Sequence, residues 1–128
     1  FVVEVSSANS RAILKHCVEL GVDTRSLLEK VGIPLKIVQD PDGRVPIEKV
    51  RKLLRESIEI TNDPSFALRA AETIPFGEFG VADFIIGNSR TLDEGLVRMC
   101  RYFRLFTEGA IINYEKNDWV QIVSSHGR

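Results

Sequence analysis

Apolar residues recur at helical spacing along most of the chain. Glycines follow the first two such runs at Gly21 and Gly32, and glycine often ends a helix. One more turn is expected over residues 34–38. The helices predicted from this pattern cover residues 10–20, 24–31, 46–61, 63–72, 81–87 and 91–106.

The clearest of these helices starts at Pro46, since proline suits the first helical position. Glu48 with Lys52, four residues apart, indicates a solvated opposite face. We expect Leu54 to belong to the hydrophobic core. The apolar stripe of this helix consists of Ile47, Val50, Leu53, Leu54 and Ile58.

The last predicted helix begins with a capping box, in which Thr91 and Glu94 stand three residues apart. Another helix start is predicted at Asp63, which is followed by Pro64 and resembles an N-cap with proline in the first turn. The apolar residues behind Thr91 step by four and three, which predicts one buried seam. They are Leu92, Leu96, Met99, Phe103 and Phe106.

After Gly109 the apolar period changes to two. Residues 110–115 and 119–124 are predicted strands, joined by a polar turn at 116–118. A lone hairpin is marginal in water, so this one must pair with more strands, lie on the helices or meet another chain. The predicted fold class is therefore α+β, a mainly helical single domain over residues 1–128 with a C-terminal antiparallel β-hairpin.

Composition is ordinary for a soluble globular domain, with 128 residues, 44% hydrophobic and 27% charged. The net charge of -1 offers no general attraction for nucleic acid or for a membrane. No apolar run is long enough to span a bilayer, and no secretory leader is recognisable. We expect a cytoplasmic protein with no membrane partner. Because the chain starts at Phe1 rather than Met, we also expect a fragment of a longer protein.

The segment "DPDGRVP" at residues 40–46 admits three interpretations: a calcium loop, a pair of catalytic acids, or a turn. Arg44 and Arg51 stand where a calcium loop needs oxygen ligands, which argues against a metal. Asp40 and Asp42 have no visible pocket that would separate their pKa values. Turn chemistry explains the residues best, because proline, aspartate and glycine in succession are typical of turns.

Enzyme signatures are missing from the sequence. His16 and Cys17 are neighbours and point to different faces of a helix, a poor metal pair. A nucleophilic cysteine–histidine pair remains open but unsupported, and Cys17 and Cys100 are expected to be buried free thiols. No nucleophile elbow, phosphate loop or dinucleotide fingerprint occurs. We expect no enzyme, no metal and no cofactor.

The run from Arg11 to Val31 has the helix, glycine, helix order of a DNA-binding helix-turn-helix. Asp23 and Glu29 would face phosphates, and Lys30 falls where the second helix should bury an apolar residue. We therefore expect no DNA-binding residues in this chain. A strip of arginines on the last helix is expected to be a solvated face or a place for an anion or a partner helix; it contains Arg98, Arg101 and Arg104.

Five landmarks together resemble one family. They are "LGVDTRSLLEKVGI" (20–33), "DPDGRVPIEKVRKLL" (40–54), "NDPSFALRAAE" (62–72), "FGEFGVADFIIGNSRTLDEGLVRMCRYFRLF" (76–106) and the hairpin. In order and spacing this is similar to the N-terminal regulatory domain of AraC-type transcription regulators, the arabinose-binding-like subgroup.

The resemblance implies a module that senses a small-molecule effector, dimerises, or both. It would act in front of a C-terminal DNA-binding domain with two helix-turn-helix units, and DNA would be bound only through that missing domain. Members of the subgroup answer to varied small molecules, so arabinose specificity is not implied. The alternative is an interaction module that dimerises without an effector.

A sensory domain needs a mostly apolar pocket with a few polar groups. Large apolar side chains near flexible backbone are densest from Phe76 to Phe84, where Gly77 and Gly80 leave room for a ligand, so we expect the effector there. Tyr102 would meet a polar ligand group and Arg69 a carboxylate. In the alternative, the aromatic side chains fill the core and Arg69 pairs with a surface acid such as Glu72 or Glu78. The candidate effector-binding residues are Arg69, Phe76, Phe79, Phe84 and Tyr102.

Overall fold

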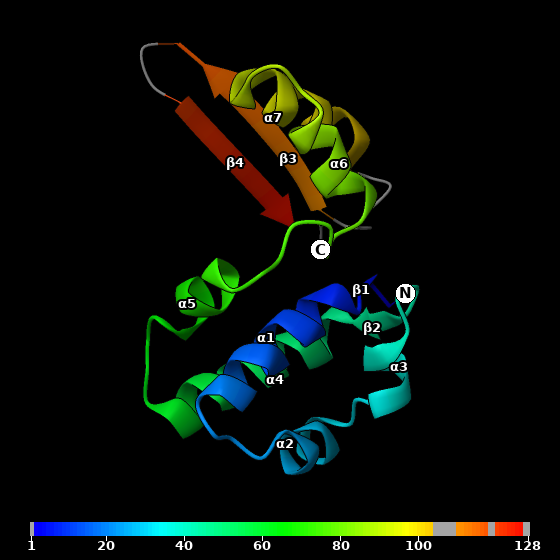
Figure 1. The fold of residues 1–128 in the computed structure, drawn as a ribbon, viewed down its shortest axis with the longest axis vertical. Coiled ribbons are helices and arrows are strands. Elements are labelled where there is room, and N and C mark those ends of the chain that lie inside the picture. The colour runs from blue at the N-terminus through cyan, green and yellow to red at the C-terminus, as the bar shows by residue number, and fades with distance from the viewer. Residues whose placement is uncertain (1, 104–109, 118–119, 127–128) are drawn as a thin grey trace. The chain divides into compact units, whose positions relative to one another are not determined.

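The computed structural model describes residues 2–103, 110–117 and 120–126, and the chain divides into two compact units (Figure 1). The first unit is Phe1–Pro75 and the second Phe76–Arg128. The first contains β1 (Glu4–Ser6), α1 (Ala8–Glu19), α2 (Thr24–Val31), α3 (Leu35–Gln39), β2 (Arg44–Pro46), α4 (Ile47–Thr61) and α5 (Phe66–Glu72). The second contains α6 (Val81–Gly87), α7 (Leu92–Tyr102), β3 (Ala110–Lys116) and β4 (Val120–His126). The prediction of a single domain stays a prediction.

The core of the first unit lies where α1, α2, α4 and α5 meet (Figure 1). Helix α1 contacts both α4 and α5, and α2 packs on α4. Apolar side chains recur on one face of each helix, so burying these faces together removes them from water. The most deeply buried large side chains are Phe66, Leu53, Val45 and Cys17.

The predicted apolar stripe of α4 is confirmed, but its most buried residue is Leu53 rather than Leu54. Leu53 is fully buried, whereas Leu54 is only partly buried and packs against the edge of the core. The predicted assignment of Leu54 to the core therefore holds only in part. Leu53 and Leu54 are about 100° apart on the helix, so one of them must face inward more directly than the other.

The segment at residues 40–46 is a turn followed by a short strand. Asp40 accepts a hydrogen bond from the backbone N–H of Asp42 through Oδ1 (2.9 Å), as turn aspartates do. Its last three residues form β2, which pairs antiparallel with β1. The sequence analysis missed both strands and placed Pro46 inside the helix. Pro46 is instead the N-cap residue, with extended backbone angles of φ -55° and ψ 132°.

This turn is held to the start of α1 by several hydrogen bonds. Ser7 donates its backbone N–H to the Gly43 carbonyl (2.8 Å) and its hydroxyl to the Asp40 carbonyl (2.7 Å). Arg11 donates to the Ser7 hydroxyl (2.7 Å) and to the Val38 carbonyl (3.0 Å). A Cβ at Gly43 would lie 2.3 Å from the Ile37 carbonyl oxygen, so only glycine fits. The turn thus fixes where α4 begins.

Helix α5 starts later than predicted. The helix begins at Phe66, and Asp63 instead caps the turn before it by accepting the N–H of Ser65 (2.9 Å). Proline at the second position of this turn follows the usual chemistry of type I and II turns.

In the second unit, the predicted cap of α7 is confirmed. The Thr91 hydroxyl accepts the N–H of Glu94 (3.1 Å), while the Glu94 carboxylate accepts the N–H of Arg90 (3.2 Å) rather than that of Thr91. Strands β3 and β4 pair antiparallel over seven residues each, and β3 contacts α7. Of the three possibilities for the hairpin, packing on a helix is therefore realised. The predicted fold class, α+β and mainly helical with an antiparallel hairpin, is confirmed.

Some predicted residues lie outside the described ranges. They are Arg104, Phe106, Asp118 and Trp119.

Candidate functional site

The loop before α6 is held in place by one carboxylate. Asp83, in the first turn of α6, accepts the backbone N–H of Gly77 (2.7 Å) and of Phe79 (3.1 Å) through one oxygen. Gly77 and Gly80 have positive φ angles of 96° and 61°, which glycine adopts without strain. Asp83 therefore ties two backbone N–H groups of this loop to the start of α6.

This loop places two of the predicted aromatic side chains together. The rings of Phe76 and Phe84 meet edge to face, with centroids 5.6 Å apart and an interplanar angle of 79°. A Cβ at Gly87 would lie 2.8 Å from the Phe76 ring, so the missing side chain makes room for this ring on α6. Both rings stay largely exposed, Phe76 at 69% and Phe84 at 54%. We name Phe76, Phe84 and the neighbouring exposed Val81 the aromatic patch.

Among the described residues, no ring contact joins the other two predicted aromatic residues, Phe79 and Tyr102, to this pair. Phe79 is partly buried and joins the loop through its backbone N–H. Tyr102 is the last residue of α7, and 44% of it is exposed. Phe76, Phe84 and Tyr102 thus do not simply fill a core, which was the alternative interpretation of these side chains.

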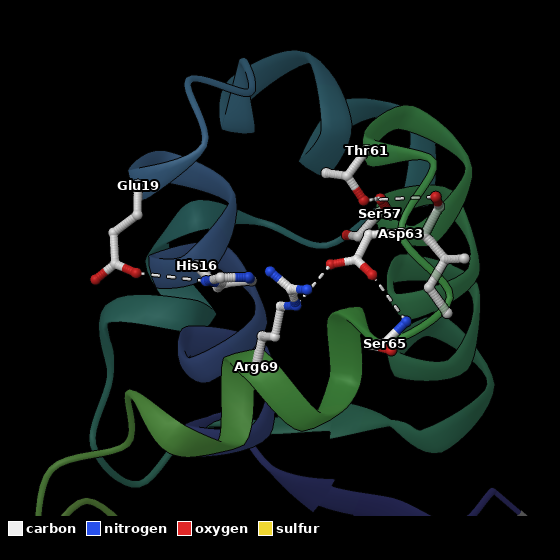
Figure 2. A network of polar contacts seen from close by, with 8 residues as sticks. His16, Glu19, Ser57, Thr61, Asp63, Ser65 and Arg69 are labelled. Carbon is white, nitrogen blue, oxygen red and sulfur yellow. Dashed lines mark hydrogen bonds and ion pairs between the residues drawn. The ribbon is translucent and has the colours of Figure 1, made fainter.

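Arg69 belongs to the first unit, on α5, and pairs with an acid that was not named among its candidate partners. Its Nε lies 3.3 Å from Oδ2 of Asp63 (Figure 2). The Asp63 carboxylate is 23% exposed, and the Arg69 side chain is 65% exposed. An exposed pair of this kind adds little stability, so Arg69 remains available to a stronger anionic partner.

A family comparison identifies the chain. Residues 21–127 match the sequence profile of the arabinose-binding domain of AraC transcription regulators, an N-terminal domain. The chain belongs to this family. A search among curated proteins gave no match. The predicted resemblance is confirmed, and the family is one of regulatory ligand-binding domains rather than of enzymes.

In this AraC-family domain, Cys17 and His16 of α1 are buried and contact side chains of neighbouring helices. The Cys17 thiol is buried and donates to the Ser57 hydroxyl (3.4 Å), which itself donates to the Leu53 carbonyl (2.7 Å). Burial raises the pKa of Cys17, which disfavours the reactive thiolate. His16 points elsewhere: its ring packs on Phe66 with centroids 4.9 Å apart. The two side chains do not form a nucleophilic pair.

The His16 ring also has polar neighbours on one side. Its Nδ1 lies 3.4 Å from Oε2 of Glu19, an exposed residue of the same helix (Figure 2). The other nitrogen, Nε2, is buried without a hydrogen-bond partner among the described residues. No residue pattern predicts that His16 is buried, because histidine is intermediate between the buried and the exposed residue types.

Two further features bear on the expected functions of the AraC-family domain. Within residues 2–103, 110–117 and 120–126, no cluster of three or more histidine, cysteine or acidic side chains is placed to hold a metal ion. In the same ranges, no helix has the length and apolar character needed to cross a membrane.

The sequence analysis also missed a groove in the first unit. It lies along α2 and the segment leading into α3, with a volume of about 720 Å³. Buried Leu28 and Ile33 line it, together with the half-exposed Leu35. Gly32 ends α2 in the left-handed conformation (φ 80°), and this turn places Ile33 and Leu35 beside the helix. The sequence pattern predicts that α2 ends at Gly32, but it does not predict the groove beside this helix end.

Proposed function

We propose that the chain is the regulatory domain of a bacterial AraC-type transcription regulator. It senses a small-molecule effector, dimerises, or both, and thereby controls a helix-turn-helix DNA-binding domain carried elsewhere in the full-length protein. The family match over residues 21–127 is the observation that supports this function. Since such a regulator works at DNA, the protein acts in the cytoplasm.

The proposed effector contacts are Arg69, Phe76, Phe79, Phe84 and Tyr102. Three facts support them. The aromatic patch exposes large rings in a fixed arrangement, and such exposed apolar surface marks interaction sites. Asp83 holds the loop beneath it. Arg69 uses Nε for Asp63, and the two terminal nitrogens of its fork suit a carboxylate.

A ligand-library thermal-shift screen of the purified chain tests the effector proposal. We expect a stabilising ligand, because a molecule that binds only the folded state raises its stability. The variants Tyr102→Ala and Arg69→Ala should weaken binding of that ligand, whereas Arg101→Ala, another exposed arginine, should not. If both variants bind it with unchanged affinity, the assignment of these residues is wrong.

The second candidate is a module that dimerises without an effector. The aromatic patch also favours this function, because exposed aromatic side chains are frequent at the centres of protein interfaces. Sedimentation of the chain alone, beside Phe84→Ser, separates the two candidates. A dimer that forms without ligand and is lost in Phe84→Ser supports dimerisation through this surface.

The chain by itself should have no sequence-specific affinity for DNA. Its net charge of -1 supplies no basic surface, and Lys30 of α2 pairs with Glu56 at 2.6 Å instead of facing phosphates. A gel-shift assay with the purified chain checks this expectation. A sequence-dependent shift that persists in salt would place DNA recognition in this domain.

A further inference from the structure

The groove beside α2 combines an apolar floor with two opposite charges. Leu28 and Ile33 are 5% and 3% exposed and form the base, while Leu35 is 50% exposed at the side. Arg25 and Glu29 line the same groove from α2 and are both exposed. The volume of about 720 Å³ lies within the range of small-molecule sites, roughly 300–1,000 Å³.

The two charged side chains are not engaged with each other. They stand four residues apart, one helical turn, with the arginine before the glutamate, which is the less favourable order for a helical ion pair. Among the described residues, neither side chain forms a hydrogen bond or an ion pair within 4.0 Å. A ligand that contacts both therefore displaces only weak interactions.

The acid nearest to Arg25 is already in use. Asp23 caps α2, where its carboxylate accepts the backbone N–H of Arg25 (3.1 Å) and of Ser26 (3.3 Å) and the Ser26 hydroxyl (2.8 Å). The hydrogen bonds from Ser26 are the main reason why the pKa of Asp23 is lowered. Glu29 is thus the acid of the groove that remains for a cationic ligand group.

We propose that this groove binds a small zwitterion with an apolar side chain, the chemistry of an apolar α-amino acid. The ligand carboxylate is held by the Arg25 guanidinium, which can bind it at two points. The ammonium group is held by Glu29, and the apolar side chain covers Leu28, Ile33 and Leu35. A purely anionic ligand would face Glu29 unfavourably, and an uncharged ligand would gain no ionic interaction with either side chain. Charge complementarity selects the zwitterion.

This inference goes beyond the proposed function, because the groove shares no residue with the proposed effector contacts. The two can fail separately. Binding in the groove is measured on the 128-residue chain with defined compounds, whereas control of transcription needs the full-length regulator and a reporter gene.

Titration of the ¹⁵N-labelled chain with L-leucine, followed by amide NMR shifts, tests the proposal. We expect saturable shifts concentrated at residues 24–35. Leucinamide lacks the carboxylate, 4-methylpentanoate lacks the ammonium group and glycine lacks the apolar side chain. Each should bind roughly tenfold more weakly than L-leucine, the effect expected from losing one charged hydrogen bond or one buried side chain.

Matched variants assign each ligand group to its partner. Arg25→Gln should remove the preference for L-leucine over leucinamide, which lacks the carboxylate. Glu29→Gln should remove the preference for L-leucine over 4-methylpentanoate, which lacks the ammonium group. Arg55→Gln, an exposed change on α4, should leave both preferences unchanged. All three positions are exposed, so the variants should fold, and circular dichroism confirms that they do. Absence of saturable L-leucine shifts, shifts centred outside residues 24–35, or unaltered preferences in both variants would overturn the proposal.

Discussion

Replacing Leu53 with alanine should be among the most destabilising single changes in the first unit. Leu53 is fully buried in the centre of the core formed by α1, α2, α4 and α5. The change removes three carbon atoms, and roughly 0.8 kcal/mol for each gives about 2.4 kcal/mol of lost transfer free energy. A residual cavity adds to this loss, so the free energy of unfolding should fall by about 3–5 kcal/mol.

Leu54→Ala provides the matched control in the same helix turn. Leu54 is only partly buried, so the same deletion should cost about 1–2 kcal/mol. Urea unfolding of both variants, followed by circular dichroism at helical wavelengths, measures the two losses. A loss below about 1.5 kcal/mol for Leu53→Ala, or an equal loss for both variants, would refute the assigned faces of α4.

Three other changes have defined outcomes. Gly43→Ala should destabilise the first unit by about 1–3 kcal/mol in a urea titration, because the added Cβ would meet backbone oxygens. Asp42→Ala, an exposed change next to it, should alter stability by less than about 0.5 kcal/mol. Equal effects of the two changes would contradict the close approach at Gly43. Asp83→Ala should accelerate hydrogen exchange at the amides of Gly77 and Phe79, measured by NMR, and unchanged rates would show that other contacts hold the loop. Tyr114→Phe should raise the pKa of Asp93 toward its ordinary value of 3.8, followed by ¹³C NMR, since the Tyr114 hydroxyl is the main cause of its lowered pKa.

The Tyr114→Phe change should also alter how the stability of the protein depends on pH. A carboxyl group whose pKa is lowered in the folded state stabilises the fold above its ordinary pKa, and this contribution is lost as the pH falls through the lowered value. The wild-type protein should therefore lose stability in that acidic range more steeply than Tyr114→Phe. Parallel loss in both proteins would show that the Tyr114–Asp93 hydrogen bond does not favour the ionised form.

The spacing of apolar residues predicted the helices well, because a helix that buries one face carries apolar residues every three or four positions. Helix α6 was predicted with its observed bounds, and the cap at Thr91 was recognised from its own residues. Strands β1 and β2 were missed because each has three residues, too few to show a period of two. Their pairing joins residues about forty positions apart, and such distant contacts leave no local trace.

The candidate site was harder to predict than the fold. The aromatic residues could be named from composition, but the edge-to-face contact of Phe76 and Phe84 depends on the space at Gly87. Asp63 was not named among the acids that could pair with Arg69, because it was assigned to a helix cap and not to the turn before α5. The groove of Arg25 and Glu29 depends on the direction of the chain after Gly32, which no residue pattern specifies.

The hydrogen bonds between the first strand and the turn before α4 bear on where this domain can be cut. The family match begins at residue 21, yet the N–H of Ile47 donates to the Val3 carbonyl (2.9 Å), and Ser7 holds the turn at Gly43. A shortened protein that started at Gly21 would lose α1, and with it the cover over Leu53 and Phe66. Such a protein should aggregate when expressed. We therefore expect that the smallest piece that folds by itself begins ahead of the residues that match the family, and that a shortened version should keep residues 2–20.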